Sequence, residues 1–129
     1  MQKGQQTIVI DPVAMNIVNR IAANTNGVGT FECSGGLIVE GYFSGTLVVN
    51  DGPLVLMQGG VISGDIQCQQ DAYLFGAIAS RESGEQSTLN AGGVVYMAET
   101  LEARADITAN VVATFEGAQV DGRIRTVRS

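Results

Sequence analysis

The chain has 129 residues, a net charge of −6 and a pI near 4.4, and its length fits a single domain. The acidic balance argues against the basic surface that binding to nucleic acid requires. Aromatic residues make up 5% and Trp is absent, so a core must be built mainly from Val, Ile, Leu and Ala. The 17 glycines follow no collagen period and indicate recurrent tight turns.

The first element in chain order is a short β-prone run, Thr-Ile-Val-Ile, at residues 7–10. Asp11 and Pro12 then suit the N-cap and the first turn of a helix. Val13, Ile17 and Ile21 recur at helical spacing. The sequence therefore predicts a short α-helix over 12–23, within an N-terminal segment of residues 1–27, that caps the open end of a stack of repeats.

From Val28 onward the apolar pattern changes to a spacing of six residues. Such a spacing is neither helical nor simple β alternation, and it predicts coils of about 18 residues with one short strand on each of three sides. Glycine-rich stretches such as Gln58-Gly59-Gly60 supply the corners. The predicted fold is all-β, a single three-sided β-helix over 28–127. The expected inward residues are Phe31, Leu37, Phe43, Val49, Leu56, Ile62, Cys68, Leu74, Leu89, Val95, Leu101 and Ile107.

A five-residue motif, apolar–x–small–x–apolar, also recurs along the chain. A unit this short cannot bury its own apolar face and must stack on its neighbours. Consecutive copies start 19, 12, 29 and 17 residues apart. The uneven steps indicate an inserted loop, and the polar stretch near 80–88 is the candidate. The copies begin at Phe43, Ile62, Leu74, Ala103 and Val120.

The chemistry that the chain lacks is equally informative. There is no His, which removes His-dependent acid–base catalysis and Ser-His or Cys-His nucleophiles, and no phosphate-binding P-loop motif occurs. Asp65 and Asp106 share one motif position and are expected to point outward from the sheet. The sequence therefore predicts a protein that is not an enzyme, with no catalytic residue, no cofactor and no metal.

The two cysteines, Cys33 and Cys68, are expected to lie about two coils apart. At roughly 4.8 Å per strand this places them near 10 Å from each other, beyond the roughly 7 Å between Cα atoms that a disulfide allows. We expect two free thiols in a reducing compartment.

The start of the chain, Met-Gln-Lys-Gly-Gln-Gln, has no apolar signal-peptide core. No apolar run approaches the roughly 20 residues needed to span a bilayer. A cytoplasmic protein is predicted, with association at the inner face of the membrane left open. At the other end Arg123, Arg125 and Arg128 form a basic cluster that is either solvated or in contact with an acidic face of a neighbour.

Three stretches carry a resemblance to a known family: Gly36-Leu-Ile-Val-Glu-Gly-Tyr-Phe-Ser-Gly-Thr-Leu47, Gly60-Val-Ile-Ser-Gly-Asp-Ile66 and Phe115-Glu-Gly-Ala-Gln-Val-Asp-Gly-Arg-Ile-Arg125. Over residues 28–125 the chain resembles the bactofilins, which are bacterial polymer-forming cytoskeletal proteins. The resemblance implies a right-handed β-helix whose subunits stack end to end, without nucleotide, into non-polar filaments. Such filaments act as membrane-associated scaffolds for cell-wall or morphogenetic enzymes.

The same resemblance implies contacts between like ends through apolar residues near the last coil. On this chain it assigns a self-assembly interface to Phe115, Val120 and Ile124, which stand in the matching terminal motif. The partner of the protein would then be itself, with a cell-wall or morphogenetic protein as a further partner and no nucleic acid.

Two alternatives remain open at this point. The first is a non-polymerising β-helical adaptor or closed dimer, in which the predicted helix blocks one end and the polar loop or the helix binds a partner. The second is a hexapeptide-type acyltransferase on a left-handed β-helix. The six-residue spacing motivates that enzyme, but the absence of His and the slips in the period disfavour it.

Overall fold

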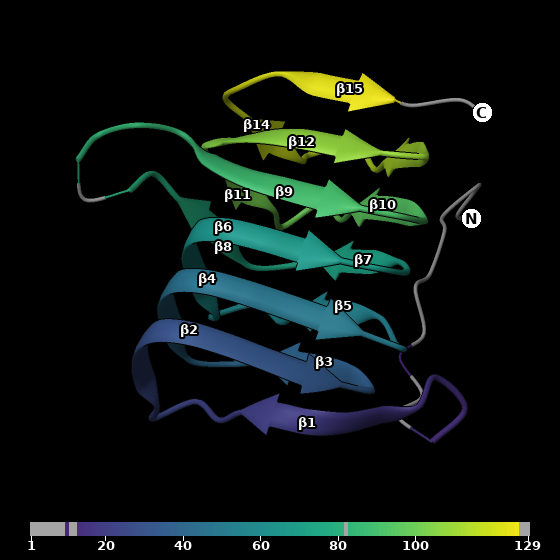
Figure 1. Cartoon of the computed structure of the whole chain (residues 1–129). Helices are drawn as coiled ribbons and strands as arrows, with labels where there is room; N and C mark the ends of the chain where they lie inside the picture. Colours follow the sequence, from purple (N-terminus) through teal and green to yellow (C-terminus); the bar gives the residue numbers. More distant parts are fainter. Residues whose placement is uncertain (1–9, 11–12, 82, 127–129) are drawn as a thin grey trace.

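The computed structural model describes residues 10, 13–81 and 83–126, and within these ranges the chain contains strands, turns and bends but no helix. The strands wind into a β-solenoid of about 6 turns with about 18 residues per turn. Figure 1 shows the turns stacked one on another, from β1 (Ile17–Ile21) at the bottom to β15 (Ile124–Thr126) at the top. Each turn pairs in parallel with the next, as the step from Leu54 to Ala72 illustrates.

One wall of the solenoid is a six-stranded sheet to which every turn contributes one short strand. Leu54 and Leu56 of its third strand point inward and are fully buried. The strands are, in spatial order, β1, β3 (Gly36–Val39), β5 (Leu54–Leu56), β7 (Ala72–Leu74), β10 (Val94–Met97) and β13 (Val111–Thr114).

The other two walls belong to one nine-stranded sheet that divides at its middle. Residues 61–63 of β6 pair with β8, whereas residues 65–68 of the same strand pair with β9. The cross-section therefore has three sides, as the six-residue spacing predicts. The long strands are β2 (Asn26–Ser34), β4 (Tyr42–Asn50) and β6 (Val61–Cys68); the first branch holds β8 (Ala77–Ala79), β11 (Glu102–Ala103) and β14 (Gln119–Val120), and the second β9 (Ser87–Ala91), β12 (Ala105–Ala109) and β15.

The core consists of inward rows that run along the solenoid axis. Phe43, Ile62, Ile78 and Ala103 form one such row, because each pairs directly with the next. All four are at most 4% exposed. Of the twelve residues that the six-residue spacing assigns to the interior, eleven are buried, and Phe31, in the first turn, is half-buried against the core. The predicted pattern of inward residues is confirmed.

The corner between the second and third walls depends on glycine. Gly29, Gly45 and Gly64 pair in register and all have positive φ. A Cβ on Gly45 would lie 1.9 Å from the carbonyl oxygen of Gly29, and one on Gly64 would lie 2.0 Å from that of Gly45. No side chain fits between these backbones, so the column fixes both the bend of the strand and the approach of the turns.

The five-residue motif corresponds to this corner in four of its five copies. The copies centred on Gly45, Gly64, Ala105 and Gly122 share the same register. The copy from Leu74 does not, because Leu74 ends β7 and a Cβ on Gly76 would meet the carbonyl oxygen of Gly60 at 2.6 Å, at a different corner.

The prediction of an N-terminal helix over 12–23 is wrong for the part that the structure describes. Residues 13–16 form a turn and Ile17–Ile21 form β1, which pairs in parallel with β3. Asn19 and Ile21 stack on the inward Leu37 and Val39, whereas Val18 points outward and is 69% exposed. A strand supplies hydrogen-bond partners to the edge of β3, and Val and Ile favour strands. The predicted cap at Asp11 and Pro12 lies outside the described residues.

The two cysteines lie as predicted. Cys33 and Cys68 pair with Val49 from its two sides, two turns apart, and both thiols are free. Burial raises the pKa of both thiols above their ordinary value. Neither thiol is therefore activated as a nucleophile.

We predict that Gly64→Ala destabilises the fold far more than Gly59→Ala. Both glycines have positive φ, but a Cβ on Gly59 meets nothing within 4 Å. Gly59→Ala should lower the free energy of unfolding by about 1–2 kcal/mol, because Ala is unfavourable in the left-handed conformation. Gly64→Ala should lower it by about 1–3 kcal/mol more, because its Cβ would overlap the neighbouring backbone. Urea unfolding followed by circular dichroism measures both, and equal losses would show that the glycine column does not control the approach of the turns.

Candidate functional site

The two ends of the solenoid present strand edges with a neighbour on one side only, among the described strands. At the N-terminal end, β1 pairs with β3 and β2 pairs with β4. At the C-terminal end, β13, β14 and β15 pair only with the strands of the turn before them. Such edges carry unpaired N–H and C=O groups that can pair with another chain. Figure 1 shows these edges at opposite ends of the stack.

The C-terminal end adds an apolar cross-section to its open strand edges. Val112, Ala118 and Val120 are half-buried and pack against the core from one side. Ile124 continues the inward row of Ile107 and is 47% exposed. These side chains have the positions of core residues, but within the described part of the chain no further turn stacks on them.

The structure brings two of the three predicted interface residues into this cross-section. Val120 stacks on Ala103 and Ile124 on Ile107, on two adjacent walls of the last turn. Phe115 belongs to the same turn but lies at the corner after β13, half-buried, where its N–H donates to the carbonyl oxygen of Met97 at 2.9 Å.

Sequence reasoning missed two further residues of this end. Val112 stacks on Val95, and Thr114 stacks on Met97, with its hydroxyl 3.8 Å from the sulfur. Both lie on the first wall, where the terminal motif has no copy. Val112 follows Val95 by 17 residues and pairs with it. This separation of about one turn was the signal in the sequence that could have placed Val112 at the end of the solenoid.

The N-terminal end has a polar inward residue on the first wall and a glycine on the second. Asn19 occupies an inward position, and its side-chain amide donates to the carbonyl oxygen of Ser34 at 2.9 Å. Gly27 takes the place that Phe43 has one turn later, and a Cβ there would lie 3.0 Å from the Phe43 ring. Phe31 meets the Phe43 ring edge-on, with centroids 6.2 Å apart. The two ends therefore present different surfaces.

The polar stretch predicted as an insertion near 80–88 joins β8 to β9 at the glycine corner; within it, Ser87 and Thr88 already belong to β9. The step between paired residues is 18 from Leu54 to Ala72 and 23 from Ala72 to Val95. Where the corner glycine would stand, Ser87 pairs with Ala105 and is fully buried. The Ser87 hydroxyl accepts from the N–H of Gly64 at 2.8 Å and donates to the carbonyl oxygen of Ala79 at 2.5 Å.

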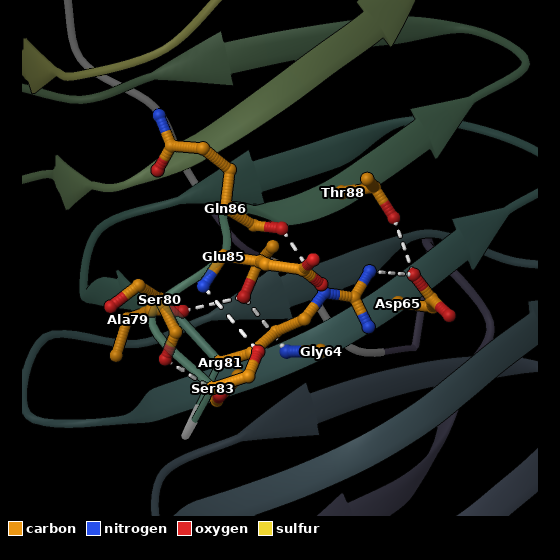
Figure 2. Close-up of polar contacts among 11 residues, drawn as sticks. Gly64, Asp65, Ala79, Ser80, Arg81, Ser83, Glu85, Gln86 and Thr88 are labelled. Atoms are coloured by element: carbon orange, nitrogen blue, oxygen red, sulfur yellow. Dashed lines mark hydrogen bonds and ion pairs between the residues drawn. The ribbon is translucent and has the colours of Figure 1, made fainter.

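An ion pair holds this loop against the third turn (Figure 2). The Arg81 guanidinium donates to a carboxylate oxygen of Asp65, and the Thr88 hydroxyl donates to the same oxygen at 2.7 Å. Arg81 also donates through Nε to the carbonyl oxygen of Gln86 at 3.1 Å. Asp65 points outward, as predicted, and its carboxylate is paired with Arg81 of the loop.

The loop also reaches the C-terminal end. The side-chain amide of Gln86 donates to the carbonyl oxygen of Asp121 at 2.8 Å. Asp121 is the residue between Val120 of β14 and the corner glycine Gly122. The insertion thus connects the third turn to the last one and braces the corner beside Val120 and Ile124.

An open groove of about 710 Å³ runs along the outer side of β8, β11 and β14. Its polar lining comes from Ser80, Glu102, Arg104, Gln119 and Asp121. The chain has no His, so this lining contains no imidazole that could act as a general base.

Comparison with protein families identifies one match that covers most of the chain. A model of the family described as "Bactofilin: Polymer-forming cytoskeletal" matches residues 19–125. The chain belongs to the bactofilin family. Comparisons with curated proteins and with solved structures give no significant match. The matched range runs from β1 to β15, so this bactofilin has its first turn and its last turn inside the family domain.

Membership describes the protein as one of a polymer-forming cytoskeletal family, which implies self-association. Among the described residues of this bactofilin, none forms a helix with the length and apolar character needed to cross a bilayer.

We predict that the loop brace weakens at low pH. The hydrogen bond from Arg81, and then that from Thr88, hold the pKa of the Asp65 carboxyl below its ordinary value. A lowered pKa stabilises the folded state above the unfolded value of about 3.9, and this contribution is lost as the pH falls through the folded value. Because the pair is partly exposed, Asp65→Asn should cost at most about 1 kcal/mol at pH 7.

Hydrogen exchange of residues 83–86 tests this prediction. Exchange should accelerate in Asp65→Asn at pH 7, and the difference from the unmodified protein should vanish as the pH falls well below 4. Asp106→Asn is the matched control, because Asp106 lies in the same outward row but accepts only the N–H of Arg123 among the described contacts. Unchanged exchange in Asp65→Asn would show that the ion pair does not hold the loop.

Proposed function

We propose that this bactofilin is a self-assembling cytoskeletal scaffold whose subunits stack end to end through the open turns of the β-solenoid. The observation that supports this most directly is the C-terminal end. There, Val120 and Ile124 have the positions of core residues but remain partly exposed. A second copy placed on this end would bury both side chains and pair the edges of β13, β14 and β15.

Assembly of this kind needs no nucleotide. The contact would consist of backbone hydrogen bonds and apolar packing, the same interactions that join one turn to the next within the subunit. The sequence has no P-loop motif that would couple nucleotide hydrolysis to assembly. The free energy of association would come from these hydrogen bonds and from apolar burial, without nucleotide hydrolysis, so polymers should form in nucleotide-free buffer.

In this proposal Phe115, Val120 and Ile124 form the assembly surface at the C-terminal end. Val120 and Ile124 contribute apolar area from two walls, and Phe115 contributes its ring from the corner. The brace from Gln86 to Asp121 would hold the backbone between them in the geometry that a second copy meets. We propose that the protein is cytoplasmic and that a morphogenetic or cell-wall protein binds along the sides of the polymer.

A second candidate is an adaptor that forms at most a dimer. The structure of the loop and the adjacent groove of about 710 Å³ favour it, because they offer a shaped polar surface on the side of the solenoid. The adaptor would bind its partner there and would not need both ends. The oligomeric state of the pure protein separates the two functions.

We predict that Ile124→Arg and Val120→Arg each dissolve the assemblies and leave the β-sheet signal in circular dichroism intact. A guanidinium placed in an apolar contact costs a few kcal/mol of desolvation, whereas on a free end it remains solvated. Electron microscopy and size-exclusion chromatography without nucleotide measure the effect. Gln67→Arg is the matched control, since Gln67 is exposed on the side of the solenoid, and it should assemble normally.

A companion variant, Phe31→Arg at the N-terminal end, distinguishes the modes of stacking. If unlike ends meet, either variant alone leaves only monomers, because each contact needs both ends. If like ends meet, each variant leaves dimers joined through the end that is still intact. Filaments that persist in Ile124→Arg and Val120→Arg would contradict the proposal, and a monomeric unmodified protein at high concentration would favour the adaptor.

A further inference from the structure

One outward row on the third wall carries opposite charges at its two ends. The row starts at Glu32 of β2 and ends at Arg125 of β15, and both side chains are exposed. Each member pairs directly with the next, and the four residues between the ends are uncharged: Val48, Gln67, Asn90 and Thr108. A row that is neutral along the side of the solenoid therefore has a carboxylate at one end and a guanidinium at the other.

Both charges are available for a contact with another subunit. Neither takes part in an ion pair with another described residue. The Glu32 carboxylate accepts a hydrogen bond from the side-chain amide of Asn50 at 3.3 Å and retains further acceptor sites. Opposite charges directly across neighbouring strands stabilise a sheet, and like charges destabilise it. Two copies stacked in parallel register would place Arg125 of one copy beside Glu32 of the next.

The glycine column is open at its N-terminal end. At Gly45, Gly64 and Gly122 a Cβ would overlap the corner carbonyl oxygen of the turn before, at 1.9–2.0 Å. Gly29 begins the same column and also has a positive φ, but a Cβ there would meet nothing within 4 Å. Its conformation already favours glycine. The space beside Gly29 is in addition the place that the carbonyl oxygen of a preceding turn would take.

The inward rows of the two ends also match in size. On the second wall the row begins at Gly27, where the Phe43 ring lies 3.0 Å from the position of a Cβ, and it ends at Val120. On the third wall the row begins at the half-buried Phe31 and ends at Ile124. Parallel stacking of two copies would set Val120 on the small Gly27 and Ile124 on Phe31. Both rows would then continue across the contact as they do between interior turns.

We propose that the C-terminal end of one subunit stacks on the N-terminal end of the next, in the parallel register that joins turns within a subunit. Arg125 then pairs with Glu32 of the next copy, and the Gly122 carbonyl oxygen fills the open space beside its Gly29. This heterologous contact repeats without closing and gives a filament whose two ends differ. The inference rests on the proposed self-assembly and adds which surfaces meet.

A contact between like ends, which the family resemblance implies, does not use these features. A two-fold axis across the solenoid runs the strands of the two copies antiparallel, so the glycine column is not continued. Glu32 and Arg125 lie at opposite ends and never meet. Where β15 pairs with its own copy, the exposed Arg123 and Arg125 of both copies face each other, and like charges across strands are unfavourable.

Charge reversal at the two ends of the row tests the pairing. Arg125→Glu or Glu32→Arg alone sets like charges against each other at every contact. Each should raise the critical concentration for assembly about threefold or more at low salt, where surface charges are least screened. The double variant restores an opposite pair and should return the critical concentration to that of the unmodified protein. Sedimentation without nucleotide measures it, and Gln67→Arg, in the middle of the same row, is the control that should assemble normally.

A double variant that assembles no better than the single variants would overturn the proposal, because only contacts between unlike ends bring the two positions together. Gly29→Ala gives a second test. Its loss of stability in urea should resemble that of Gly59→Ala, which also has positive φ and open space, but only Gly29→Ala should remain monomeric. Filaments or dimers of Gly29→Ala would count against the proposal.

Cryo-electron microscopy of the filaments determines the polarity directly. A subunit of about 6 turns is about 29 Å long at roughly 4.8 Å per turn. Unlike ends give an axial repeat of one subunit, whereas like ends give a repeat of two, about 58 Å. The longer repeat would overturn this inference and leave the proposed self-assembly intact. An unmodified protein that stays monomeric at high concentration would overturn both.

Discussion

The parallel register between successive turns is the constraint on which the rest of this structure depends. Each residue stacks on the residue one turn earlier, so the kind of residue that suits one position recurs along the axis. The inward rows of Leu, Ile and Val arise in this way, and so does the glycine column through Gly29, Gly45 and Gly64. In that column a backbone oxygen occupies the space of a Cβ. The turns can approach closely enough to hydrogen-bond at this corner only because these residues have no Cβ.

The inserted loop shows how strongly the register is held. Five additional residues separate Ala72 from Val95, yet the strands on both sides of the insertion stay in register with their neighbours. Ser87 takes the corner position, and its hydroxyl bonds to Gly64 and Ala79. Arg81 and Gln86 then tie the loop to Asp65 below and to Asp121 above. Surface loops tolerate insertions, and here the inserted residues also connect turns that are not adjacent.

Successive turns of a solenoid make the same kind of contact with each other, and each subunit contains only a finite number of turns. The last turn therefore has the apolar rows and strand edges of an interior turn without the next layer. This is the physical basis for self-association in a polymer-forming family. The side walls set the opposite requirement, since an outward apolar row such as Val55 and Tyr73 must be covered if growth is to stay along the axis. The polar row on the third wall, through Thr46, Asp65 and Thr88, meets this requirement without a cover.

The sequence by itself determined the all-β repeat architecture, the three sides, the interior residues and the free thiols, because all of these follow from a period that is repeated many times. It also placed Val120 and Ile124 in the terminal repeat. Only the tertiary structure decided the identity of β1, because the spacing of Val13, Ile17 and Ile21 suits a helix and the edge of β3 selects a strand. It also excluded Leu74 from the motif and added Val112 and Thr114 to the C-terminal end. A local pattern cannot distinguish these cases, because the turn on which a residue stacks is known only once the chain is wound.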